Sequence, residues 1–291
     1  MSTLYISDLD GTLLQNDAFL SPFSESSLRE MLADGLLFTV ASARSVVSIQ
    51  QMLRGLPLTL SVIEFNGAYL SDLSTGRHEV INALEPSVAA SVYEQVTAQG
   101  LSPFIASFDG IADRKHYGAI LNAGMQWFLQ DRMSRHDPRL RGPADNLATS
   151  LQEQVVCLTI IAKREVLADL EAAILEAHMG RVETHLFENQ YCPGWYWLTV
   201  HDHRATKDQA IKTLTKSYGL GDSEIVVFGD HINDLKMFAA ADRAIAVGNA
   251  QPEAKACANL VIGTNEEDSV ARFIRGHWED HRLLRSVKAP E

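Results

Sequence analysis

Short apolar runs alternate with segments of helical periodicity at both ends of this chain. Strand-like runs near the N-terminus cover residues 3–7, 36–42 and 60–67. The alternation resumes after residue 206, with strand-like runs at residues 224–229, 243–248 and 259–263. Strands separated by helices pair in parallel through right-handed crossovers. The pattern therefore predicts an α/β fold, a three-layer Rossmann-like core with a parallel central sheet.

The middle of the chain breaks this alternation. Residues 68–81 read as a hairpin around Ser74-Thr75-Gly76, and helices and strands then follow without regular order. Such a mixture is typical of an α+β unit rather than of a continued parallel sheet. We therefore predict a core in two parts, 1–83 and 201–291, with an α+β domain inserted at 84–200.

Composition narrows the class of partner. Lys and Arg number 25 against 37 Asp and Glu, a net charge of −12, which argues against nucleic acid and anionic membranes as partners. An anionic substrate stays compatible, because a bound cation reverses the local field. The sequence shows no apolar run near the ~20 residues of a membrane span, and no signal-peptide pattern. We expect a cytoplasmic protein that is a monomer or a small homo-oligomer.

The cysteines and one pair of histidines do not match the pattern of a disulfide or a metal site. Cys157, Cys192 and Cys257 form no CxxC pair, which favours reduced thiols. His201 and His203, with Asp202, could chelate zinc, but no distant ligand that would complete the site is evident. The aromatic run at residues 191–198 favours the core of the inserted domain, or its interface with the first part, over a surface that stacks on substrate.

Polar residues gather where the predicted parallel strands end, which is where open parallel sheets bind ligands. Asp8 and Asp10 follow the first strand, Ser42 ends the second, and Asp230 follows the strand at 224–229. We expect the same sheet edge to carry Arg44, Asn66, Gly67, Lys207, Asn233 and Asp234.

Several carboxylates in one place repel one another and raise each other's pKa values. A hard divalent cation with oxygen ligands removes that repulsion, and Mg²⁺ fits this description. Mg²⁺, a lysine and a hydroxyl together bind a phosphoryl group. Asp8 and Asp10, at i and i+2 on an extended segment, point to one side, so one could attack phosphorus while the other handles the leaving-group proton.

Four motifs in this order resemble those of the haloacid dehalogenase superfamily, which consists mostly of phosphatases. They are "DLDGTLL" at 8–14, "TVASAR" at 39–44, the isolated Lys207, and "GDHINDLKMF" at 229–238. Their spacing resembles the Cof-type branch, in which a large α/β cap lies between the second and third motifs. The resemblance extends over nearly the whole chain.

The resemblance implies a role for each matching residue. Asp8 would be the nucleophile that forms an aspartyl-phosphate, and Asp10 the general acid and then general base, while Ser42 and Lys207 would hold the phosphoryl group. The implied ligands of a Mg²⁺ cofactor are Asp8, Asp10, Asp230 and Asp234. The implied phosphate- or substrate-binding residues are Leu9, Gly11, Thr12, Ser42, Ala43, Arg44, Asn66, Gly67, Lys207 and Asn233.

Some positions depart from the family pattern. Ala43 stands where glycine is usual, which raises a question about loop geometry, and Asp208 replaces the glycine that usually follows the lysine. His231 occupies a variable position that faces either the substrate or the surface. Arg44 serves either as a substrate contact or as one half of a structural salt bridge.

Our functional hypothesis is a Mg²⁺-dependent phosphatase of a small phosphorylated metabolite, such as a sugar phosphate, a nucleotide or a phosphorylated cofactor. One alternative is a phosphomutase, although mutases of this superfamily usually carry a small helical cap at another insertion point. Another is a non-catalytic phospho-acceptor module that uses clustered aspartates, a hydroxyl, a lysine and Mg²⁺. Such modules lack the insertion and the second aspartate, and they would retain phosphate after treatment with acetyl phosphate.

Overall fold

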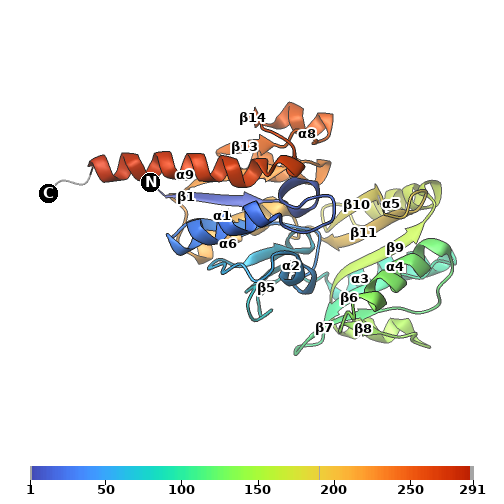
Figure 1. Ribbon diagram of the computed structural model, residues 1–291. Helices are drawn as coiled ribbons and strands as arrows, with labels where there is room; N and C mark the ends of the chain where they lie inside the picture. Colours follow the sequence, from blue (N-terminus) through green and yellow to red (C-terminus); the bar gives the residue numbers. More distant parts are fainter. Residues whose placement is uncertain (1, 190, 289–291) are drawn as a thin grey trace. The chain divides into compact units, whose positions relative to one another are not determined.

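The computed structural model describes residues 2–189 and 191–288 and divides into two compact units (Figure 1). The first unit combines the two chain ends, residues 1–80 and 206–291. The second unit is the segment between them, residues 81–205. No helix in the described part of the chain is long and apolar enough to cross a membrane.

A five-stranded parallel sheet forms the centre of the first unit. In order across the sheet, its strands are β14 (Leu260–Val261), β13 (Arg243–Ala246), β12 (Glu224–Gly229), β1 (Thr3–Ser7) and β2 (Leu37–Val40). Each neighbouring pair is parallel. Every residue of β1 is buried, because helices cover both faces of a parallel sheet, and this explains why its three central residues are hydrophobic. The predicted parallel core is confirmed.

The helices of this unit follow its strands. They are α1 (Pro22–Ala33), α2 (Val46–Met52), α6 (Lys207–Ser217), α7 (Leu235–Ala239), α8 (Pro252–Cys257) and α9 (Ser269–Lys288). The Ser21 hydroxyl caps α1 by accepting from the backbone N–H of Ser24 at 2.9 Å. Helix α1 packs against α9, and α6 packs against α7, so the apolar stripes of the helices meet the strands in one core.

The third predicted strand differs from expectation. The sequence predicts residues 60–67 as a strand of the parallel sheet, but β3 (Val62–Glu64) pairs antiparallel with β4 (Tyr69–Ser71) in a separate sheet completed by β5 (His78–Ile81). A parallel bridge between Ala41 and Ile63 joins it to the core. The tight turn at Phe65–Gly67 then sends the chain back alongside β3 as β4.

The second unit is built on a mixed sheet of six strands, which is the inserted α+β element that the sequence predicts. In order, the strands are β10 (Val182–Glu188), β11 (Tyr196–Asp202), β9 (Gln154–Ala162), β6 (Phe104–Phe108), β7 (Asp113–His116) and β8 (Leu140–Arg141). Neighbouring strands are antiparallel, except that β7 and β8 run parallel.

Helices lie on both faces of this second sheet. Helices α3 (Pro86–Ala98) and α5 (Arg164–Ala177) pack on the face that carries Leu198, whereas α4 (Ala123–Ser134) packs on the face that carries Trp197. Consecutive strand residues point to opposite faces, which separates the two clusters. Trp197 belongs to the α4 cluster and Trp195 packs against it, so of the alternatives for the aromatic run these two side chains follow the core one.

Candidate active site

Two neighbouring parallel strands deliver the central carboxylates. The backbone N–H of Asp8, just after β1, donates to the Phe228 carbonyl of β12 at 2.9 Å, and Asp230 follows the end of β12. Asp234 comes from the short 3₁₀ turn Ile232–Asp234. Carboxylate oxygens of Asp8, Asp230 and Asp234 lie within 4.8 Å of one another. The sheet edge therefore brings three predicted metal ligands together.

Lys207 bridges two of these acids. Its Nζ donates to Asp8 Oδ1 at 2.5 Å and to Asp234 Oδ1 at 2.6 Å, and all three side chains are buried. Burial acts to lower the pKa of Lys207, but Asp234 and Asp8 outweigh it and raise the pKa above its ordinary value. The lysine is therefore a permanent cation next to Asp8.

One lysine does not compensate three carboxylates. Burial raises the pKa of Asp8 well above its ordinary value, against the opposing effect of Lys207. Burial and the neighbouring Asp234 raise the pKa of Asp230 to about 6. The cluster thus has an excess of negative charge that a divalent cation would offset.

Asp234 also fixes the loop that carries Asp230. Its Oδ2 accepts from the backbone N–H groups of Asp230 at 3.0 Å and His231 at 3.1 Å. A Cβ on Gly229 would lie 2.6 Å from the same oxygen, so only glycine fits there. Both oxygens of Asp234 are therefore engaged, one with Lys207 and the other with the loop.

The turn after β1 lies against the carboxylate of Asp230. Residues Leu9–Leu13 form one wide turn in which Gly11 has a φ of +75°, a conformation that favours glycine. A Cβ on Gly11 would lie 2.6 Å from Asp230 Oδ2, and the Thr12 hydroxyl donates to Asp230 Oδ1 at 2.9 Å. Gly11 and Thr12 therefore shape the site around Asp230.

Asp10 is paired with Arg44 and does not belong to the group of three clustered acids. Arg44 Nε donates to Asp10 Oδ2 and Nη2 donates to Asp10 Oδ1, both at 2.6 Å. The two side chains are partly exposed, 24% for Arg44 and 33% for Asp10. Of the two hypotheses for Arg44, the structure shows the salt bridge.

Ser42 lies buried at the end of the second strand. Its backbone N–H donates to the Ile63 carbonyl at 2.9 Å, and its hydroxyl accepts from the backbone N–H of Arg44 at 3.2 Å. Ala43 between them is exposed and does not belong to the described residues with positive φ. The alanine therefore introduces no backbone strain at this position.

The Asn66-Gly67 turn links two parts of the site. The backbone N–H of Asn66, at a φ of 57°, donates to the Ser42 carbonyl at 2.9 Å, and its side-chain oxygen accepts from Asn233 at 3.4 Å. A Cβ on Gly67 would lie 2.6 Å from the carbonyl oxygen of Thr206, the residue before Lys207. Glycine at position 67 thus allows the turn to approach the start of α6.

Two asparagines that the sequence analysis did not select support the wide turn. Asn249 donates to the Gly11 carbonyl at 2.7 Å, and Asn265 donates to the Leu14 carbonyl at 2.9 Å. Asn249 follows the end of β13, so the rule that selected Asp230 could also have found it. Leu9 contributes only its backbone to this region, because its side chain lies in the hydrophobic core.

Comparison with known proteins places this geometry in a family. Residues 5–274 match the haloacid dehalogenase-like hydrolases. The chain belongs to this family. A haloacid dehalogenase-like hydrolase from Bacteroides thetaiotaomicron has the same fold, with a TM-score of 0.75 and 23% identity over 94% of this chain and 98% of that one. The predicted family and fold are confirmed.

Curated relatives of this hydrolase are named as phosphatases. Pyridoxal phosphate phosphatase YbhA of Escherichia coli is 28% identical over 93% of this chain and 96% of its own. The 5-amino-6-(5-phospho-D-ribitylamino)uracil phosphatase YitU of Bacillus subtilis is 24% identical over 93% and 96%. The similarity covers nearly the full length of each relative, so it includes the inserted unit.

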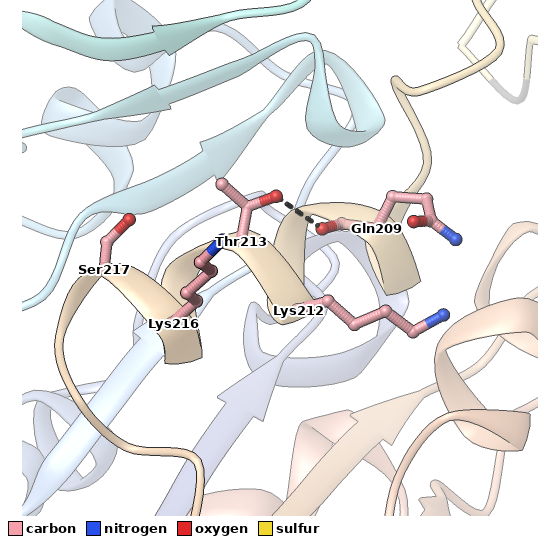
Figure 2. Close-up of a pocket in the computed structure, with 5 residues that line it drawn as sticks. All are labelled: Gln209, Lys212, Thr213, Lys216 and Ser217. Atoms are coloured by element: carbon pink, nitrogen blue, oxygen red, sulfur yellow. Dashed lines mark hydrogen bonds between the residues drawn. The ribbon is translucent and has the colours of Figure 1, made fainter.

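Other polar features of the hydrolase lie outside the acid cluster. A surface hollow of about 540 Å³ runs along α6 and is lined by Gln209, Lys212, Thr213, Lys216 and Ser217 (Figure 2). None of the clustered aspartates lines it. His201 is buried and bonded to the Val156 carbonyl, and the metal-ligand group found in the described residues includes neither His201 nor His203.

Proposed function

We propose that this hydrolase is a Mg²⁺-dependent phosphatase that acts on a small phosphorylated metabolite. The observation that carries the proposal is the buried contact of Lys207 with both Asp8 and Asp234, beside Asp230. This contact supports the proposal, because a carboxylate next to a cation and further carboxylate oxygens is the set of groups that phosphoryl transfer through a metal requires. The names of the phosphatase relatives support the same reaction class.

The donor set fits Mg²⁺. It consists of carboxylate oxygens, the type of ligand that a hard cation prefers, and two of the three acids have raised pKa values without a cation. Asp8 and Asp230, with the Asp10 carbonyl, would hold the metal, and Asp234 would support it through the loop. When bound, Mg²⁺ would neutralise negative charge on the transferring phosphoryl group.

In the proposed reaction, each residue of the site has a separate role. Asp8 attacks phosphorus, and the bond between phosphorus and the ester oxygen breaks as Asp10 gives that oxygen a proton. Lys207 and Ser42 hold the phosphoryl oxygens. Asp10 next removes a proton from water, which attacks the aspartyl-phosphate, releases phosphate and restores Asp8. Arg44 orients Asp10 through its two-point contact.

The inserted unit is the proposed source of substrate selectivity. We assign it the role of the cap, with the predicted limits of residues 84–200. Relatives with comparable full-length similarity are named for pyridoxal phosphate, for a phosphoribitylamino uracil and for HMP-PP. We therefore propose phosphorylated cofactors and their precursors as the first substrates to test, ahead of sugar phosphates and nucleotides.

A phosphate-release screen tests the proposal. The protein is incubated with a panel of phosphorylated cofactors, nucleotides and sugar phosphates, with Mg²⁺ and with a chelator. We expect release from at least one class of substrate with Mg²⁺, and loss of that release with chelator. Stable phosphate retention after acetyl phosphate treatment, with no release from any substrate, would instead support a phospho-acceptor module.

A further inference from the structure

A buried glutamate lies behind the loop that carries Ser42 and Arg44. Glu64 is the last residue of β3, and its side chain is 0% exposed. A carboxylate without contact to water is stable only where hydrogen-bond donors or a cation compensate its charge, and an apolar side chain would meet a need for packing alone. The partners of Glu64 therefore indicate which part of the molecule this carboxylate holds in place.

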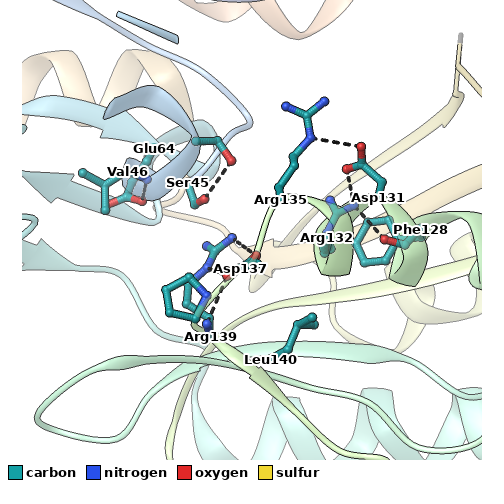
Figure 3. Close-up of polar contacts among 12 residues, drawn as sticks. Ser45, Val46, Glu64, Phe128, Asp131, Arg132, Arg135, Asp137, Arg139 and Leu140 are labelled. Carbon is teal, nitrogen blue, oxygen red and sulfur yellow. Dashed lines mark hydrogen bonds and ion pairs between the residues drawn. The ribbon is translucent and has the colours of Figure 1, made fainter. Parts of the chain in front are cut away.

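The first partner of Glu64 lies two residues after Arg44. Oε2 of Glu64 accepts from the backbone N–H of Val46, the first residue of α2, at 2.5 Å (Figure 3). Ser45 precedes this helix, but its side chain makes no capping hydrogen bond. Glu64 therefore caps α2 from a neighbouring strand, in place of a side chain at the N-cap position.

The other oxygen of Glu64 is held by the rest of the small sheet. The hydroxyl of Ser71, on β4, donates to Oε1, and Nδ1 of His78, on β5, lies 3.4 Å from the same atom. Ser71 Oγ also forms a hydrogen bond with His78 Nδ1 at 2.6 Å, and the His78 ring stacks on Tyr69 with the ring centroids 4.0 Å apart. All three strands of this sheet therefore fix the position of the carboxylate.

The segment from Ser42 to Val46, which we call the Arg44 loop, is fastened to β3 and the turn that follows it. Backbone hydrogen bonds hold its start at Ser42 and its middle, where the N–H of Phe65 donates to the Arg44 carbonyl at 3.1 Å. Glu64 holds its end at Val46. Arg44 therefore lies between two points that β3 and its turn fix.

The position of the Arg44 loop determines where the Arg44 guanidinium can lie. Nε and Nη2 of Arg44 each donate to one oxygen of Asp10, both at 2.6 Å. A two-point contact of this kind depends on the backbone that carries the arginine. A displacement of about 1 Å can reduce a catalysed rate by about 100-fold. Glu64 therefore affects the orientation of Asp10 through the Arg44 loop.

We propose that Glu64 is a positioning residue for the phosphatase reaction. It fixes the end of the Arg44 loop, so that Arg44 orients Asp10 for proton transfer to the leaving group. Glu64 thus acts through Arg44 rather than on the substrate. The inference rests on the proposed function, because the role of Asp10 as general acid belongs to that proposal.

A double-mutant cycle tests whether Glu64 acts through Arg44. The kcat/KM for phenyl phosphate with Mg²⁺ is measured in wild type, Glu64→Leu, Arg44→Met and the double variant. Leucine has a similar size but accepts no hydrogen bond, so Glu64→Leu alone should lower kcat/KM about tenfold. In Arg44→Met protein it should cause no further loss, because the arginine that it positions is absent. Losses that multiply in the double variant would overturn the proposal.

The leaving group provides a readout that a purely structural role would not change. Phenolate is a stronger base than para-nitrophenolate, so its departure depends more on a proton from Asp10. The loss in Glu64→Leu should be about tenfold for phenyl phosphate but about twofold for para-nitrophenyl phosphate. Glu64→Gln keeps an acceptor for the Val46 N–H and should recover most of the loss. Equal losses for the two esters would overturn the proposal.

Glu79→Leu is the matched control. Glu79 is a glutamate of the same small sheet, and it accepts from the Ser61 hydroxyl at 2.7 Å and from the Tyr218 hydroxyl at 3.3 Å. Its loss should leave kcat/KM for both esters at the wild-type value. Ser71→Ala removes the hydroxyl that donates to Glu64 and replaces Glu64→Leu if that variant does not fold, with a smaller change in the same direction.

An NMR measurement separates this inference from the proposed function, because it needs no turnover. The Arg44 Nε–H group, bonded to Asp10, should exchange slowly with solvent in wild type and in Glu79→Leu. Glu64→Leu should speed this exchange about tenfold. Unchanged exchange in Glu64→Leu would overturn the inference even in an active enzyme. Faster exchange in a protein that hydrolyses no phosphate ester would contradict only the proposed function.

Discussion

Lys207 Nζ lies 2.5 Å from Asp8 Oδ1 and 2.6 Å from Asp234 Oδ1, with all three groups buried. The lysine thus connects the proposed nucleophile to the residue that fixes the Asp230 loop. A change at Lys207 therefore affects charge, position and stability together.

Lys207→Met should reduce both stability and activity. Removing the cation leaves Asp8 and Asp234 buried without it, which we expect to cost about 3 kcal/mol or more of unfolding free energy. Turnover should fall by about 100-fold or more, because a phosphate-binding charge is lost. Urea unfolding and initial rates measure the two effects, and Mg²⁺ should restore part of the stability.

Lys212→Met is the control for that experiment. Lys212 lies on the same helix, is 61% exposed and contacts Asp208 at 3.4 Å. Its loss should change unfolding free energy by no more than about 0.5 kcal/mol. Equal effects of the two substitutions would show that the buried bridge has no special importance.

Arg44→Met should separate activity from stability. The Arg44–Asp10 pair is partly exposed, so its loss should cost under about 1 kcal/mol. The Asp10 carboxyl would lose its fixed orientation, and we expect kcat/KM to fall about tenfold. Arg44→Lys should recover little of it, because lysine cannot make the two-point contact. A kcat/KM equal to that of wild type in Arg44→Met would refute the orienting role.

Much of this site could be predicted from the sequence, because the ends of parallel strands meet at one edge. That rule selected Asp8, Ser42 and Asp230 without any structure. The strand–helix alternation also predicted residues 60–67 as a strand of the parallel sheet, but only the Ala41–Ile63 bridge is parallel there, and β3 pairs antiparallel with β4. The left-handed conformations of Phe65 and Asn66 reverse the chain at the Asn66-Gly67 turn signal, but that signal does not say that β3 then pairs antiparallel with β4.

Other features depend on contacts between distant residues. The engagement of both Asp234 oxygens, one by Lys207 and the other by the loop, follows from tertiary packing rather than from a motif. The same is true of the two-point contact between Arg44 and Asp10. Helix α4 is not predicted from the sequence, because its apolar residues show little helical periodicity.

The effect of Mg²⁺ on stability should depend on pH. The pKa of Asp230 is raised to about 6 from 3.8, so the folded state retains a proton that the unfolded state has released. Without metal, stability should therefore fall as pH rises from about 4 to 6. Thermal unfolding should show a larger stabilisation by Mg²⁺ at pH 7.5 than at pH 5. Asp230→Asn should weaken this difference, and an equal Mg²⁺ effect at both pH values would argue against metal binding here.

The contribution of Lys115 to folding stability should change with pH in the opposite direction to that of Asp230. Its pKa is lowered to about 7 from 10.5 by burial, Arg132 and Arg139, with smaller opposing effects of Cys157 and Asp137. The folded state therefore binds fewer protons than the unfolded state above pH 7, and this contribution to stability should grow as pH rises from 7 to 9. Cys157, whose pKa is raised above 9.0, opposes the trend only at higher pH.

Urea unfolding of wild type and Lys115→Met from pH 7 to 9 measures the contribution of Lys115 to stability. The difference between the two unfolding free energies should narrow as pH rises, because Lys115 loses its unfavourable charge. His201 also lies near Lys115, but burial lowers its pKa to about 4, so it stays neutral throughout. A constant difference from pH 7 to 9 would mean that Lys115 does not titrate there.

The most direct test of the central claim is the Asp8→Asn variant. The amide has nearly the same size as the carboxylate, and its oxygen can still accept a hydrogen bond from Lys207, but it cannot attack phosphorus. With Mg²⁺, wild type should hydrolyse para-nitrophenyl phosphate, and Asp8→Asn should lose essentially all of that turnover while unfolding cooperatively. Hydrolysis by Asp8→Asn at the wild-type rate would contradict the assignment of Asp8 as nucleophile.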